Sequence, residues 1–192
     1  EISLGLVGSE MCIRDSDYEN GYSLYIGIPF CPTTCLYCSF TSYPLVSWRQ
    51  KVDSYLDALE KELDYVAVKF GKKHLNSIYI GGGTPTTLEP YQLDRLIRKI
   101  RCSFDLSHCL EFTVEAGRPD SITREKLETL KKWDITRISI NPQTMKDETL
   151  KIIGRRHTVA QTVESFQLAR ELGFDDINMD LITVSYTHLR AH

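Results

Sequence analysis

The chain has 192 residues, of which 42% are hydrophobic and 26% are charged, and its formal net charge at pH 7 is -3. This composition is ordinary for a folded domain and excludes the disordered and fibrous classes. A weakly acidic chain has no broad basic surface, so we expect no nucleic-acid partner. No apolar run approaches the roughly 20 residues that span a bilayer, and no signal-peptide pattern is present, so we expect no membrane span and a cytoplasmic location.

Short apolar runs alternate along the chain with amphipathic segments. The apolar runs predict five strands, at residues 24–28, 77–80, 110–115, 137–140 and 177–182. Apolar residues at steps of three and four predict a helix over residues 52–70 that ends at Gly71, and a basic helix around residues 93–101. We interpret the basic face of this second helix as a solvated exterior and not as a binding site.

Two further helices have recognisable starting residues. One begins near Thr123, which is a suitable N-cap. The other begins at Thr158, which forms a capping-box pattern with Gln161, and it ends before Gly173. We expect their inward faces to carry Leu127, Leu130 and Trp133 in the first, and Val163, Phe166 and Ala169 in the second.

This alternation of strands and helices is typical of βα units on a parallel sheet. Chemically unusual residues lie at or just past the carboxyl ends of the five predicted strands, and in a β/α barrel that edge of the sheet carries the active site. We therefore expect one functional edge. Its members would be the segment 31–38, the glycine-rich turn 81–85, Glu115, residues 141–143 and Asp180.

Three cysteines, Cys31, Cys35 and Cys38, follow the first predicted strand at C-x3-C-x2-C spacing. Three thiolates can hold three irons of a cubane 4Fe-4S cluster and leave the fourth iron open to another ligand. A structural zinc site is the alternative, but zinc in that role normally takes four ligands. An odd trio cannot pair internally as disulfides. Cys102 and Cys109 have no metal-ligand spacing, and we interpret them as buried or incidental thiols.

The glycines of residues 81–83 and Glu115 are further candidates for a binding site. Backbone N–H groups of a triglycine turn can approach a ligand with no Cβ in the way, and Thr84 adds a hydroxyl. Glu115 ends an apolar strand, where a buried carboxylate needs a cationic or hydrogen-bonding partner. That partner is either a bound ligand or a neighbour such as Arg118.

Four other side chains complete the candidate site. Arg155 can clamp a carboxylate in bidentate fashion, with a solvated arginine at a helix end as the alternative. Asp180 lies in an apolar strand end, which favours a hydrogen-bonded role over exposure. Tyr25 and Tyr37 bracket the cysteines, and their rings either belong to the core or contact a ligand. We interpret His157 as a surface or packing residue.

Several of these motifs resemble a known family. The C-x3-C-x2-C spacing resembles the signature of the radical S-adenosylmethionine (SAM) superfamily. Within it, the chain resembles the oxygen-independent coproporphyrinogen III dehydrogenases and their relatives HemN, HemW and HemZ through Tyr25-Ile-Gly-Ile-Pro-Phe-Cys31, Gly81-Gly-Gly-Thr-Pro85 and Asn178-Met-Asp-Leu-Ile182. Residues 111–120 and 137–143 resemble HemZ most. The implied fold is α/β, a partial (β/α) TIM-like barrel of the radical SAM type with about five parallel strands, open and truncated.

The resemblance implies a 4Fe-4S cluster held by Cys31, Cys35 and Cys38, and SAM as the second cofactor. The positions that match SAM contacts are Tyr25, Tyr37, Gly82, Gly83, Thr84, Glu115, Gln143, Arg155 and Asp180. No side chain is then itself the catalyst, because the cofactors supply the reactivity. The implied activity is oxidative decarboxylation of coproporphyrinogen III to protoporphyrinogen IX in haem biosynthesis. Its implied partners are a porphyrinogen substrate and an external one-electron donor of the flavodoxin or ferredoxin kind.

Two positions depart from the dehydrogenase proper, which has a cysteine where this chain has Phe40 and a histidine where it has Gly27. A haem carrier or chaperone of the HemW type is therefore the first alternative function. A zinc-binding structural module is the second.

Both ends of the chain resemble translated sequencing-adapter read-through, with genuine disordered tails as the alternative. The predicted organisation is a non-native tail at residues 1–16, a radical SAM core at residues 17–183 and a second non-native tail at residues 184–192. We expect the core to be an incomplete barrel that does not turn over on its own.

Overall fold

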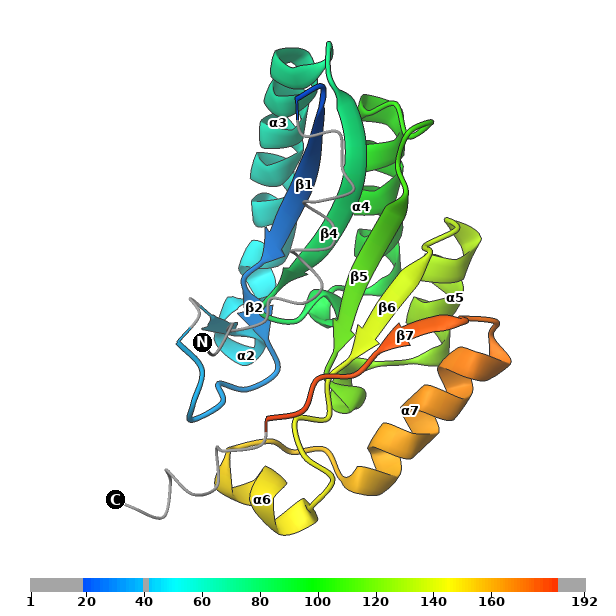
Figure 1. Ribbon diagram of the computed structural model, residues 1–192. Coiled ribbons are helices and arrows are strands. Elements are labelled where there is room, and N and C mark those ends of the chain that lie inside the picture. The colour runs from blue at the N-terminus through cyan, green and yellow to red at the C-terminus, as the bar shows by residue number, and fades with distance from the viewer. Residues whose placement is uncertain (1–18, 40–41, 183–192) are drawn as a thin grey trace, which may run out of the picture.

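The computed structural model describes residues 19–39 and 42–182, so the two predicted tails lie outside the described residues. A five-stranded parallel sheet has the order β1-β4-β5-β6-β7 (Figure 1). Its strands are β1 (Gly21–Ile28), β4 (His74–Gly82), β5 (Glu111–Gly117), β6 (Arg137–Ile140) and β7 (Asp176–Asn178). Within the described chain, β1 and β7 are edge strands, so the sheet is open. The predicted open sheet of five parallel strands is confirmed.

Three long helices cover one face of this sheet. They are α3 (Val52–Phe70), α4 (Pro90–Ser103) and α5 (Arg124–Lys132), and Figure 1 shows them behind the strands on the same side. Every second residue of these strands points toward the helices. These residues are apolar and at most 2% exposed: Ile26, Ile28, Ile78, Ile80, Val114, Ile138 and Ile140. Because successive strand residues point to opposite faces, the residues between them face away from these helices. Tyr25 and Tyr79 on that other face are 61% and 36% exposed.

The helix boundaries follow the capping residues. The Thr123 hydroxyl accepts a hydrogen bond from the Lys126 amide at the start of α5, and Thr158 forms the predicted capping box with Gln161. Both predicted starts are confirmed. α4 starts with a capping box of its own, formed by Glu89 and Gln92, and its first residue is Pro90. This start was not predicted.

Short elements fill the connections. β2 (Phe30–Cys31) and β3 (Tyr43–Pro44) form a separate parallel pair, followed by α2 (Leu45–Trp48) and the 3-10 turn η1 (Arg49–Lys51). Two more 3-10 turns, η2 (Pro85–Thr87) and η3 (Pro119–Ser121), come directly after β4 and β5. The last helices are α6 (Asp147–Ile152) and α7 (Val159–Glu171). Because β2 contains Cys31, the β2–β3 pair fixes where the cysteine segment begins.

Two predictions about the last βα unit were wrong. The strand predicted over residues 177–182 ends at Asn178, whose side chain donates a hydrogen bond to the Asp180 carboxylate. Such a local side-chain contact competes with the strand ladder. In α7, Val163 was predicted to face inward but is 42% exposed, and the buried face carries Thr162, Ser165 and Ala169. These smaller side chains let the helix approach its neighbours closely.

The basic face of α4 forms ion pairs with the acidic face of α3. Arg95 contacts Asp57 at 2.6 Å and Glu60 at 2.7 Å, and Lys99 contacts Asp64 at 2.5 Å. Exposed pairs of this kind add little stability, but they leave α4 without a free basic stripe. Among the described helices, none is long and apolar enough to cross a membrane.

Candidate functional site

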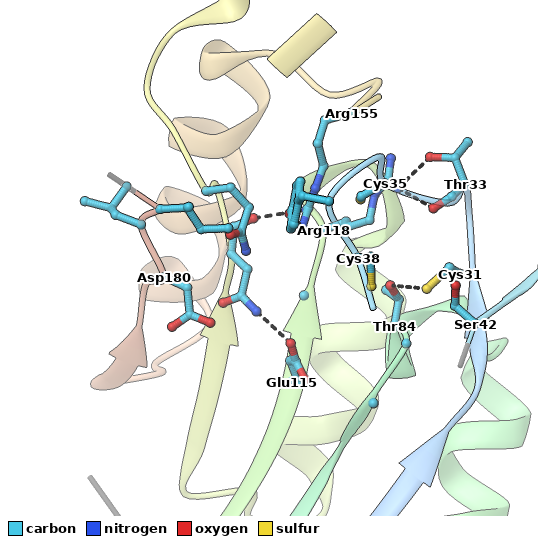
Figure 2. A pocket seen from close by; sticks show the side chains of 18 of the residues that line it. Cys31, Thr33, Cys35, Cys38, Ser42, Thr84, Glu115, Arg118, Arg155 and Asp180 are labelled. Carbon is cyan, nitrogen blue, oxygen red and sulfur yellow. Dashed lines mark hydrogen bonds between the residues drawn. The ribbon is translucent and has the colours of Figure 1, made fainter. Parts of the chain in front are cut away.

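A cavity of about 520 Å³ opens at the carboxyl edge of the sheet (Figure 2). Eleven of the twelve predicted site residues line it: Cys31, Cys35, Tyr37, Cys38, Gly82, Gly83, Thr84, Glu115, Gln143, Arg155 and Asp180. Tyr25 is not among the lining residues, and its ring stacks on that of Tyr79 at 5.8 Å on the exposed face of the sheet. The segments that supply the eleven residues lie at or just past the carboxyl ends of all five strands, so the residues predicted to share one edge of the sheet do share it.

The cysteine loop (residues 31–38) forms one wall of the cavity. Its ends are held by β2–β3 pairing and by a turn in which the Cys38 amide donates to the Cys35 carbonyl at 3.1 Å. Midway, the Leu36 amide donates to the Ile153 carbonyl at 3.1 Å, which ties the loop to the end of α6. All three cysteines are free thiols. Burial raises the pKa of the Cys31 thiol, and the Thr84 hydroxyl lies 3.7 Å from its Sγ atom as a donor.

The glycine turn (residues 81–83) packs against this loop. A Cβ atom on Gly83 would lie 2.9 Å from Cys31 Sγ and 2.7 Å from the Phe30 carbonyl oxygen, so only glycine fits. The Gly83 amide donates to the Ile28 carbonyl at 2.7 Å, and the Thr84 amide donates to the Phe30 carbonyl at 2.8 Å. The prediction that the triglycine turn offers its backbone N–H groups to a ligand was therefore wrong for the Gly83 amide. The role of these two amides is to hold the turn beside the first cysteine.

Glu115 lies on β5 and faces the cavity from the side opposite the cysteines, as Figure 2 shows. Its Oε1 atom accepts a hydrogen bond from Asn141 Nδ2 at 2.7 Å. Burial, followed by the nearby Asp180 carboxylate, raises the pKa of Glu115 to about 7. The alternative ion pair with Arg118 was wrong, because Arg118 binds Asp120 at 2.9 Å instead.

Arg155 is 9% exposed, so it is not the solvated arginine of the alternative interpretation. Its Nη2 atom donates to the Tyr37 hydroxyl at 3.0 Å, and its Nη1 atom donates to the Asn141 carbonyl at 3.2 Å. Arg155 thereby connects the cysteine loop to the end of β6. His157 is 2% exposed, which confirms a packing role, and burial together with the Arg155 charge lowers its pKa to about 4.

Gln143 and Asp180 form the remaining wall. Gln143 has a φ of +66°, and its amide donates to the Asp180 carbonyl at 3.0 Å while its carbonyl accepts from the Ile182 amide at 2.8 Å. These contacts continue the sheet past β7 as a single bridge. The Asp180 carboxylate accepts a hydrogen bond from the Asn178 side chain, as predicted. The Asp180 side chain is nevertheless exposed at the cavity mouth, which the prediction disfavoured.

Asn141, Thr33 and Arg118 also line the cavity, and no site role was predicted for them individually. Asn141 was predicted at the functional edge as part of residues 141–143, because it directly follows a strand, but no contact was assigned to it. Arg118 was considered only as a partner of Glu115. Thr33 carries no signal beyond its place between two cysteines.

The donor set and the shape of the cavity fit an iron–sulfur cluster with a polar organic ligand beside it. Three thiols open onto the space. Two buried polar atoms of the wall, Asn141 Oδ1 and Arg155 Nε, have no hydrogen-bond partner within the described chain, so they can meet a donor and an acceptor of a ligand. Among the described residues, no three His, Cys, Asp or Glu side chains form a ready-made site for a single metal ion.

Known proteins resemble this chain in sequence and in fold. HemZ of Bacillus subtilis (strain 168), an oxygen-independent coproporphyrinogen-III oxidase-like protein, is 49% identical over 164 residues, which cover 83% of this chain and 32% of HemZ. The heme chaperone HemW of the same organism is 45% identical over 164 residues, covering 83% and 42%. The structure of coproporphyrinogen III oxidase (HemN) from Escherichia coli, titled a radical SAM enzyme, matches with a TM-score of 0.75 and 32% identity, covering 83% and 36%.

The chain thus spans about a third to two fifths of the length of these relatives. The family model described as the radical SAM superfamily matches residues 25–189, which is most of the chain. That match agrees with the cysteine loop, the glycine turn and the open parallel sheet. The chain therefore belongs to the radical SAM superfamily, and the cofactors of that family are the predicted 4Fe-4S cluster and SAM.

Proposed function

We propose that this chain is the radical SAM core of a HemZ-like protein that carries out oxygen-independent oxidative decarboxylation of coproporphyrinogen III to protoporphyrinogen IX. The observation that carries the proposal is the convergence of eleven predicted residues, from segments that follow five strands, on one cavity. The 49% identity to HemZ and the 32% identity to HemN support the choice of substrate. A cytoplasmic location is part of the proposal.

In this proposal the three cysteines hold the cluster and the opposite wall holds SAM. When bound, the reduced cluster supplies an electron that cleaves SAM into methionine and a 5′-deoxyadenosyl radical. Glu115 and Asp180 provide carboxylates for the amino group and ribose hydroxyls of SAM, and Arg155 provides a cation for its carboxylate. Tyr37, Gly82 and Gly83 line the same cavity and would help to enclose these groups.

The chain's residues bind and orient the cofactors and move no proton in the proposed reaction. At each of two propionate side chains, the overall change would be the loss of one hydrogen atom, one electron and CO2, which leaves a vinyl group; SAM would supply the acceptor of the hydrogen atom, and an oxidant outside this chain would take the electron. An external flavodoxin- or ferredoxin-like donor provides the electron for SAM cleavage. Tyr25 is exposed beside Tyr79 on the face of the sheet that the helices leave uncovered. In a barrel this face is the concave side that receives substrate, so we propose that Tyr25 contacts the substrate as well as SAM.

The first test is anaerobic reconstitution of the 192-residue chain with iron and sulfide. We expect a 4Fe-4S electron paramagnetic resonance signal after reduction and a change in that signal on adding SAM. Bound zinc without iron, and no SAM affinity, would contradict the proposal and favour the zinc-binding module.

The second candidate is a HemW-like haem carrier, which the 45% identity to HemW and the phenylalanine at position 40 favour. The test uses a protein that contains this chain and the remaining length of its relatives. With reductant, SAM and coproporphyrinogen III, the proposal requires 5′-deoxyadenosine, CO2 and a vinyl-bearing porphyrinogen. Stoichiometric haem binding without a decarboxylated product would favour the carrier.

A further inference from the structure

Arg118 is a buried charge in the cavity wall that the predicted cofactor contacts do not use. It is 3% exposed. Its Nε and Nη2 atoms donate to the two carboxylate oxygens of Asp120 at 3.0 and 2.9 Å. This bidentate pairing fixes the plane of the guanidinium and uses one of its edges. The remaining nitrogen, Nη1, is therefore free to contact a third group.

That third group is Thr33, in the middle of the cysteine loop. Arg118 Nη1 donates to the Thr33 carbonyl at 3.0 Å and to its hydroxyl at 2.6 Å, as Figure 2 shows. Thr33 is two residues from Cys31 and two from Cys35. Its hydroxyl also donates to the Gly154 carbonyl at 3.4 Å. The loop is thus fastened to the end of β5 on one side and to the segment after α6 on the other.

We propose that Arg118 is a positioning residue for the iron–sulfur cluster, which fixes the cysteine loop and directs the positive end of the Arg118–Asp120 pair toward the cluster. The inference rests on the cluster site of the proposed function and on no assumption about the substrate. Hydrogen bonds and net charge around a cluster set its reduction potential, and a nearby cation favours the reduced form. Residues that orient metal ligands typically contribute about 10–100-fold to metal affinity.

A purely structural role is the alternative, since loss of any buried ion pair destabilises a fold. Arg95, whose ion pairs are partly exposed, provides a control outside the cavity. It also binds two carboxylates through its guanidinium, but it lies in the contact between α3 and α4, away from the cavity. The same substitution at both positions separates an effect on the cluster from an effect on folding.

The experiment compares Arg118→Gln, Arg118→Lys and Arg95→Gln with the unmodified chain after reconstitution. Two quantities are measured: the rate of iron loss to a chelator, and the midpoint potential from a redox titration followed by electron paramagnetic resonance. We expect Arg118→Gln to lose iron about 10-fold faster and to have a more negative potential. Arg118→Lys should restore the potential toward the original value but not the iron retention, because an ammonium cannot hold Asp120 and Thr33 together.

Arg95→Gln should match the unmodified chain in both measurements. The inference is overturned when Arg118→Gln behaves like Arg95→Gln. If Arg118→Gln does not fold, Thr33→Val removes the hydroxyl contacts and keeps the side-chain shape, and unchanged iron loss in that variant overturns the inference instead. If the unmodified chain forms no cluster, the site itself is refuted, and the role of Arg118 with it.

Discussion

The core under the helices and the cavity at the sheet edge use the same strands, but apolar packing stabilises the core and polar hydrogen bonds organise the cavity. In the core, the buried residues are apolar and pack against helices, as Ile78 and Ile138 do at 0% exposure. At the cavity, buried and half-buried polar groups are tied to specific partners, as Arg155 is to Tyr37 and Glu115 to Asn141. Stability should therefore depend on the middle of the strands and cofactor binding on the residues just past their ends. Substitutions can test whether the two are separable.

The largest effect should come from the cysteine loop. Replacing Cys31, Cys35 or Cys38 with alanine removes one of three thiolates, so we expect each variant to lose the cluster completely while it keeps its far-ultraviolet circular dichroism. Iron and sulfide analysis after reconstitution measures this. The controls are Cys102→Ala and Cys109→Ala, which lie outside the cavity lining and should bind as much iron as the unmodified chain. Unchanged iron content in any single loop variant would place the cluster elsewhere.

In the core, Ile78→Ala should have the converse effect. Ile78 is fully buried on β4, and truncation of such a residue costs about 2–5 kcal/mol of stability because it leaves a cavity. We expect a lower free energy of unfolding in urea and an unchanged iron stoichiometry in the fraction that folds. Loss of the cluster in folded protein would show that core and site are coupled.

Two glycines allow a finer comparison. Alanine at Gly83 meets the Phe30 backbone and Cys31 Sγ at less than 3 Å, so we expect about 1–3 kcal/mol of destabilisation together with reduced cluster loading. Alanine at Gly27 meets only the Tyr25 ring at 3.6 Å, and its effect should stay within about 0.5 kcal/mol. Urea unfolding and iron analysis of both variants measure the difference. Equal behaviour of the two variants would contradict the packing described for the glycine turn.

The smallest effect should be the pH dependence contributed by Glu115. Its pKa is raised from 4.5 to about 7, so between these values the folded chain keeps a proton that the unfolded chain has released. Its contribution to stability is therefore present below pH 4.5 and is lost as the pH rises through 7. From about pH 5.5 to about pH 8, Glu115→Gln should lose less stability than the unmodified chain, by on the order of 1 kcal/mol. Parallel pH profiles for the two proteins would contradict this.

Apolar spacing was sufficient to predict the framework. The period of three and four residues placed α3 at residues 52–70, and the apolar runs located all five strands. The rule that parallel strands gather their functional residues at the carboxyl edge then brought most of the site together. These patterns are local in the sequence, and buried apolar residues follow them closely.

The partners of buried charges could not be predicted in the same way. Glu115 and Arg118 are three residues apart, but the β5–β6 register shifts between Glu115 and Gly117, and Gly117 has a φ of +69°. Such a bulge changes the direction in which the following side chains point. Arg118 therefore contacts Asp120 and the cysteine loop instead of Glu115. The exposed position of Val163 has a similar origin, since the neighbours of α7 decide which face is buried.

The pairing of β2 with β3 has a thermodynamic consequence for metal binding. Phe30 pairs with Tyr43 and Cys31 with Pro44, so the two ends of the segment that carries the ligands are already together. Closing a free loop of about a dozen residues costs roughly 2 kcal/mol in chain entropy. Here that entropy is lost when the polypeptide folds, before iron arrives, so the ends of the loop are already together although the three thiols do not yet form a metal site. Cluster assembly should consequently raise the melting temperature of this chain less than it would for a loop that the metal alone must close.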